Sequence, residues 1–114
     1  MPVWDDVVRA ATDLPETEPS TMHGSACLRV HGKAFAVDGS HVEGYIVLWC
    51  APEEKAALLA SGDPAFCTTP HYDGHGSILV DLDRVDAGQL AELVTDAWRM
   101  RAPASILDPR PGRR

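Results

Sequence analysis

The sequence predicts an α+β domain, and the order of segments within residues 43–101 carries that prediction. An apolar, β-branched segment (43–50) is followed by a helix that begins at Pro52, and a second such segment (77–83) is followed by an amphipathic helix (86–100). β-branched and aromatic residues favour strands, whereas apolar residues spaced three and four apart favour a helix. We therefore expect an α+β domain in which strands and helices alternate along these residues.

The first half of the chain predicts a helix, a loop and a hairpin in that order. Apolar residues at helical spacing predict a helix over 3–14, whereas 15–25 has no period and many turn formers, which predicts a loop. Residues 26–31 and 33–37 are separated by one glycine and predict a β-hairpin. Short connections then place 26–31, 33–37 and 43–50 in a three-stranded antiparallel meander.

The second half contains local signals for where each helix begins and ends. Pro52 fits the first turn of a helix, where its missing N–H has no helical partner to lose, and the turn-forming residues 61–64 end that helix. Asp86 and Gln89 form a candidate capping box at the start of the last helix. Residues 65–76 are rich in histidine and glycine and predict a loop.

Length and composition predict one cytoplasmic domain. A chain of 114 residues with 45% apolar residues is long enough for one self-sufficient core. No apolar run approaches the ~20 residues that span a bilayer, and the N-terminus does not have the pattern of a signal peptide. Three widely spaced cysteines without a CxxC pair favour reduced thiols. We expect a domain over 1–103 and a Pro/Arg-rich tail over 104–114.

The sequence carries none of the common enzyme signatures. It has no GxSxG, P-loop, GxGxxG or HExxH motif and no paired-carboxylate pattern. A non-enzymatic protein without a cofactor is therefore expected.

Charge is divided unevenly along the chain. Residues 1–98 contain sixteen acidic and five basic side chains, a net charge of −11, and residues 99–114 carry +4, so that the whole chain is at −7. An acidic surface repels polyanions at long range, so non-specific nucleic-acid binding by the whole surface is disfavoured. Only the C-terminal end offers a local basic patch.

Four short motifs occur in a fixed order along most of the chain. They are LRVHGKAFA at 28–36, Pro52-Glu53-Glu54 after a strand, Phe66 with Thr69-Pro70-His71-Tyr72, and the strand at 78–82 followed by Arg84-Val85-Asp86. Their order and spacing resemble the MmcQ/YjbR family of small bacterial proteins, over residues 4–103. The resemblance implies a frataxin/CyaY-like fold, which is an antiparallel sheet of about four or more strands with helices packed on one face. It also implies a double-wing arrangement and the DNA-binding role with which family members are often labelled. The chain departs from the family in its acidic body and in having Ser77-Ile78 where a tryptophan is often found.

Nucleic-acid binding is the first functional hypothesis. Arg29 and His31 are two residues apart, so on a strand they share a face, and Lys33 extends that face across the turn. Together they form a small basic wing for phosphates, to which Arg99 and Arg101 add charge if the last helix ends nearby. The alternative reading of these residues is a solubilising sheet face.

Two other kinds of site remain open. The first is a small-molecule site on the open face of the sheet, lined by Tyr45, Trp49 and Tyr72. The second is a metal site by analogy with CyaY. The weak candidate ligands are His71, Asp73 and His75, in a loop whose plain alternative is a polar turn. Cys67, near these histidines, is a further candidate nucleophile. No membrane partner is expected.

Overall fold

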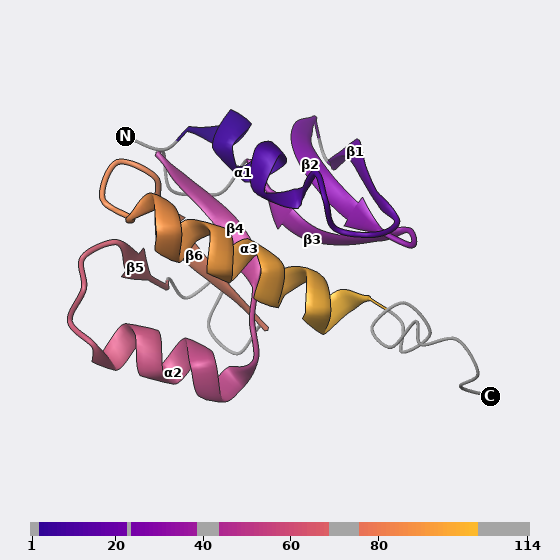
Figure 1. Cartoon of the computed structure of the whole chain (residues 1–114). Helices are drawn as coiled ribbons and strands as arrows, with labels where there is room; N and C mark the ends of the chain where they lie inside the picture. Colours follow the sequence, from indigo (N-terminus) through magenta and orange to yellow (C-terminus); the bar gives the residue numbers. More distant parts are fainter. Residues whose placement is uncertain (1–2, 23, 39–43, 69–75, 103–114) are drawn as a thin grey trace.

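The chain builds an open antiparallel sheet with helices against it (Figure 1). In a computed structural model, six strands and three helices are formed by the described residues, which are 3–22, 24–38, 44–68 and 76–102. The elements in chain order are α1 (Trp4–Ala11), β1 (Thr17–Met22), β2 (Ser25–Val30), β3 (Lys33–Val37), β4 (Tyr45–Trp49), α2 (Pro52–Ala60), β5 (Phe66–Cys67), β6 (Ser77–Asp81) and α3 (Ala87–Arg101). The α+β prediction is confirmed.

All six strands belong to one sheet. Their order is β1-β2-β3-β4-β6-β5, with every neighbouring pair antiparallel. The first four strands form a meander because short connections join consecutive strands. The segment after β4 forms α2 and β5, and the chain then returns as β6 between β4 and β5.

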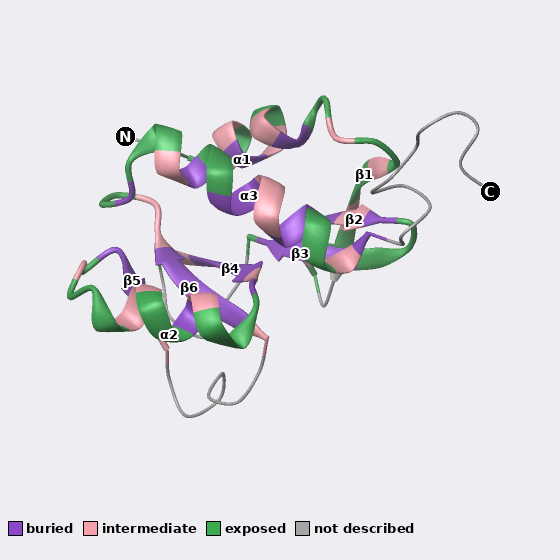
Figure 2. Cartoon of the chain, turned by 60° about the horizontal axis from the view of Figure 1, so that its bottom comes forward, coloured by how far each residue is buried: buried purple, intermediate pink, exposed green. Residues whose placement is uncertain are grey.

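The helices share one face of the sheet, and the main core lies beneath them. Strand residues such as Ile46 and Leu48 of β4 pack there with Val7 of α1 and Val94 of α3, all of them buried. Leu58 contributes α2 to the same core. Figure 2 shows this division, with buried positions on α3, β4 and β6 and exposed positions on the outer surfaces of the helices.

Local sequence signals set the helix starts as expected. Pro52 occupies the first turn of α2, and the Asp86 carboxylate accepts a hydrogen bond from the Gln89 N–H at 3.1 Å as the N-cap of α3. The first helix is shorter than the predicted 3–14, since α1 ends at Ala11 in a turn where the Thr12 N–H bonds the Arg9 carbonyl.

Two predicted loops contain strands. Residues 15–25 were expected to form a loop, but β1 lies within them and pairs with β2 along its whole length, from Thr17 opposite Val30 to Met22 opposite Ser25. Within 65–76, β5 pairs with β6 through Phe66 and Cys67. Neither segment has strand periodicity of its own, so pairing with a neighbouring strand decides its conformation.

The join between β3 and β4 is the thinnest place in the sheet. These strands register at only two residue pairs, Ala36 with Leu48 and Val37 with Val47, whereas β4 and β6 register at five. Continuing the β3–β4 register would place Ala34 opposite Cys50. The Cys50 N–H instead donates to the Gly76 carbonyl, on the β6 side, at 3.0 Å, so it does not extend the pairing with β3. Helix α3 packs across both β3 and β4 and so holds the two parts of the sheet together (Figure 1).

Both edges of the sheet are protected against further strand pairing. The β5 edge has two residues. At the β1 edge, the His31 N–H donates to the Glu16 carbonyl at 3.5 Å. The backbone N–H and C=O of Glu16 therefore point toward β2. The direction of these backbone groups alternates from one residue of a strand to the next, so at Pro19, three residues further on, the backbone points away from β2. Because proline has no N–H, it offers no hydrogen-bond donor to another strand at this edge. A proline at that position disfavours the pairing of β1 with another strand.

We expect Pro19→Val to increase self-association, because valine restores the outward N–H and favours extended backbone. Size-exclusion chromatography with light scattering would show a higher average mass than for the wild type at equal concentration. Thr21→Val is the matched control, since it adds an apolar β-branched residue to the same edge and keeps Pro19. Equal masses for all three proteins would contradict this account of the edge.

A candidate ligand-binding face of the sheet

The sheet face opposite the helices has its own apolar row. Cys27, Val37, Val47 and Leu79 lie directly opposite one another across β2, β3, β4 and β6, and all four are buried. Cys67 of β5 lies opposite Leu79 and extends the row. The described residues of this second cluster all come from strands.

The aromatic residues of β4 flank this row. Side chains alternate along a strand, so Tyr45, Val47 and Trp49 share one face while Ile46 and Leu48 face the helices. Tyr45 and Trp49 are half-buried, whereas Val47 between them is 4% exposed. The structure therefore places two of the three predicted ligand-binding residues on one face.

The Tyr45 end of the face is polar. The Tyr45 hydroxyl and the Cys67 thiol are hydrogen-bonded, and Asp81 lies opposite Tyr45 on β6. Arg84 Nε lies 3.3 Å from Asp81 Oδ2, so a guanidinium and a carboxylate stand beside the phenol. Burial, followed by the charges of Cys67 and Asp81, raises the pKa of Tyr45. The phenol therefore stays protonated at neutral pH.

At the Trp49 end of the face, Arg101 packs over the indole ring. The Arg101 guanidinium lies 5.3 Å from the centre of the Trp49 ring, and its Nε donates to the Ala34 carbonyl at 3.1 Å. A cation over an aromatic face adds electrostatic attraction to the hydrogen bond. Arg101 thus connects the end of α3 to β3 and β4 at the thin join of the sheet.

Arg29, the centre of the predicted basic wing, is engaged within the protein. Its Nε donates to Ser20 Oγ at 3.1 Å, and its two terminal nitrogens donate to the carbonyls of Gly32 and Thr21, each at 3.2 Å. These contacts connect β1, β2 and the turn that follows. The guanidinium is largely committed to holding the hairpin.

The remaining predicted nucleic-acid residues are divided between the hairpin turn and α3. His31 and Lys33 are exposed at the turn between β2 and β3, where His31 (φ 52°) and Gly32 (φ 85°) adopt left-handed backbone conformations. His31 therefore lies in the turn and not on the strand that carries Arg29. Arg99 is exposed on α3, with its Nη1 3.8 Å from Asp96 Oδ1.

The predicted loop site lies outside the described residues. This holds for Tyr72 and for the candidate metal ligands His71, Asp73 and His75. Within the described part of the chain, no group of three or more His, Cys, Asp or Glu residues is arranged to hold a metal ion.

Cys50 and Cys67 have environments that oppose thiolate formation. Burial raises the pKa of Cys67, and burial together with Glu54 raises that of Cys50 to about 11. An attacking thiol normally has a lowered pKa, so neither environment favours a nucleophile. Sequence reasoning considered Cys67 only in that role and missed its place beside Tyr45, because β5 itself was not predicted.

A scan against protein-family models matches residues 12–100 to the YjbR model. The chain belongs to the YjbR family. Among curated relatives, this YjbR domain is 34% identical over 121 aligned positions to the uncharacterized proteins Rv2570 of Mycobacterium tuberculosis (strain H37Rv) and Mb2600 of Mycobacterium bovis, covering 94% of each chain.

The solved structures support the fold of the YjbR domain. The Deinococcus radiodurans protein DR2400, described with a DUF419 domain, matches with a TM-score of 0.73 and 19% identity, over 88% of this chain and 78% of that one. At this identity the likeness concerns the fold. Within the described residues, no helix has the length and apolar character needed to cross a membrane.

Arg101→Ala should lower the free energy of unfolding by about 1–3 kcal/mol, because it removes both a hydrogen bond to the carbonyl of the buried Ala34 and a cation–π contact. Urea denaturation would measure the change. Arg99→Ala is the matched control, two residues away on α3, and should change stability by less than about 0.5 kcal/mol because its ion pair is exposed. Equal effects of the two substitutions would show that Arg101 does not hold the join of the sheet.

Alkylation with iodoacetamide should modify Cys67 first, since Cys27 and Cys50 are buried and Cys67 is half-buried. Cys50 should resist modification up to about pH 10 in the folded protein, because its pKa is about 11. The folded-state pKa of Cys50 also lies above its unfolded value of 9.0. The stability that the protonated Cys50 thiol contributes is therefore lost as the pH rises from the unfolded-state pKa to about 11. Mass spectrometry of the native protein against a urea-unfolded control measures the order, and early labelling of Cys50 would contradict it.

Proposed function

We propose that this YjbR domain is a non-enzymatic binding protein whose ligand surface is the sheet face around Tyr45, Val47 and Trp49. The observation that carries the proposal is the aromatic pair on the central strand, beside a row of buried strand residues on the face opposite the main core, where Arg101 at the end of α3 contacts Trp49. Binding sites combine an apolar lining with a few placed polar groups, and aromatic side chains provide large contact areas.

The two ends of this face support a ligand with an apolar body and a polar group. Val47 and Leu79 form a buried apolar row between the half-buried aromatic residues. The Tyr45 phenol and the Asp81–Arg84 pair stand at one end, where they offer hydrogen-bond donors and acceptors. A small amphipathic molecule, aromatic or aliphatic, fits this distribution.

The same contacts weaken the case for DNA. Phosphate binding needs cations that are free to neutralise the backbone, and both Arg29 and Arg101 donate to carbonyls of the protein. Lys33 and His31 remain exposed at the hairpin turn. By themselves they form a small basic patch on a chain of net charge −7. We therefore place DNA second and include it as a competing arm of the test.

The test uses 1-anilinonaphthalene-8-sulfonate as the apolar probe, an anionic amphipathic molecule whose fluorescence rises in apolar sites. The wild type should bind it saturably, and Tyr45→Ala should weaken binding by about threefold to tenfold, as expected for the loss of one aromatic contact. Met100→Ala removes an exposed apolar side chain from α3 instead and should leave binding unchanged. Near-ultraviolet circular dichroism confirms that each variant is folded.

A labelled DNA duplex titrated in parallel separates the two hypotheses. Binding of the duplex that falls steeply with salt and weakens in Lys33→Gln, with no effect of Tyr45→Ala on the probe, would replace the ligand proposal by the DNA hypothesis. Equal loss of probe binding in Tyr45→Ala and Met100→Ala would also count against the sheet face.

A further inference from the structure

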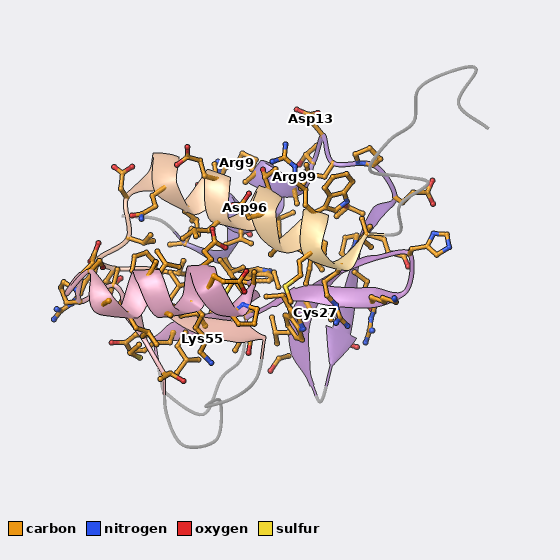
Figure 3. All side chains as sticks on the ribbon, turned by 90° about the horizontal axis from the view of Figure 1, so that it is seen from below. Arg9, Asp13, Cys27, Lys55, Asp96 and Arg99 are labelled. Carbon is orange, nitrogen blue, oxygen red and sulfur yellow. The ribbon has the colours of Figure 1, made fainter. Side chains whose placement is uncertain are left out.

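A groove runs between α2 and α3 on the helical side of the molecule, away from the proposed ligand face. It has a volume of about 560 Å³ and is lined by both apolar and charged side chains. Leu58 of α2 and Leu93 of α3 are among its apolar lining, and Glu54, Glu92 and Asp96 are its acidic lining. Figure 3 shows Asp96 projecting from α3 near α2.

The acidic side chains of the groove outnumber its cations. Arg99 is the basic residue in the described lining, and its Nη1 lies 3.8 Å from Asp96 at an exposed position. Glu54 and Asp96 come from different helices, and their carboxyl groups approach one another across the groove. Burial, followed by Asp96, raises the pKa of Glu54, as expected for a partly buried carboxyl group beside another acidic side chain.

The other described arginines are engaged elsewhere in the protein. Arg9 and Arg84 pair with Asp6 and Asp81, and Arg29 and Arg101 donate to backbone carbonyls. Lys55 projects from α2 away from Asp96 in Figure 3 and does not line the groove. The remaining arginines of the chain are Arg110, Arg113 and Arg114, which follow the described residues.

We propose that the α2–α3 groove binds the C-terminal segment 103–114 of the same chain, with an arginine of that segment between Glu54 and Asp96. A guanidinium has donors on several edges and can bond two carboxylates at once. The segment also carries Ile106 and Leu107, whose apolar side chains suit the Leu58 and Leu93 part of the groove.

The length of the segment is sufficient. Helix α3 ends next to Ala102, and Glu92 lies ten residues before it, a distance of about 15 Å along a helix. Twelve residues follow Ala102, and their extended length is up to about 40 Å. Arg110, the eighth of them, therefore reaches any part of the groove when the chain turns back along α3.

Carbodiimide cross-linking of the full-length R113K variant tests this contact directly. The reagent joins a lysine amine to a carboxylate in contact with it, and mass spectrometry identifies the pair. We expect Lys at position 113 to link to Glu54, Glu92 or Asp96, with a several-fold loss of those links in 0.5 M NaCl and in an E54Q/D96N background. Lys33, exposed on the hairpin turn, is the internal reference for random linkage.

Hydrogen exchange of the full chain gives a second, independent measurement. The R110Q/R113Q/R114Q variant should exchange faster than the wild type over Pro52–Ala60 and Ala87–Arg101, whereas R9Q, which removes one exposed arginine of α1, should not. Links spread over all carboxylates as for Lys33, or unchanged exchange in the triple variant, would overturn the proposal. Links found only between isotopically distinct copies would overturn it too, because the segment would then dock on a second molecule.

Discussion

The packing of α3 across the join between β3 and β4 is the constraint on which the rest of the structure depends. The two strands register at only two residue pairs, so backbone pairing alone joins the meander weakly to the β4-β6-β5 part of the sheet. Buried residues along α3 pack on strands from both sides of that join. The Trp98 Nε1–H donates to the Pro15 carbonyl at 2.9 Å, and Arg101 donates to Ala34, so the helix is also connected by hydrogen bonds to segments far away in sequence.

This constraint determines what the arginines do. In a chain of net charge −7, a guanidinium that satisfies a carbonyl stabilises the fold more than one left in solvent, because an unpaired buried acceptor costs about 1–3 kcal/mol. Arg29 holds the hairpin and Arg101 holds the join. The cations that a polyanion would need are thereby reduced to those on exposed turns and at the C-terminal end. A basic residue in a sequence motif is therefore not by itself evidence of a phosphate contact.

The two faces of the sheet carry different sets of buried residues. The helical face holds the main core, and the opposite face holds a row of four buried side chains with aromatic residues beside it. Strand alternation makes this division unavoidable, because each strand that buries one set of residues under the helices presents the next set on the other side. Under the proposed function, the strand side of this domain is the surface that meets a ligand, and the helical side holds the main core.

The sequence by itself determined the elements whose signals are local. Pro52 placed the start of α2, Asp86 with Gln89 placed the start of α3, and the alternation around Gly32 placed the hairpin, because backbone preferences and capping act within a few residues. It also determined that Tyr45 and Trp49 share a face, which follows from their spacing on one strand. Only the tertiary structure decided that Thr17–Met22 and Phe66–Cys67 are strands, that Cys67 lies beside Tyr45, and that Arg29 and Arg101 are engaged. These features depend on partners distant in the chain, and the free energy that fixes them comes from pairing and burial that no local pattern records.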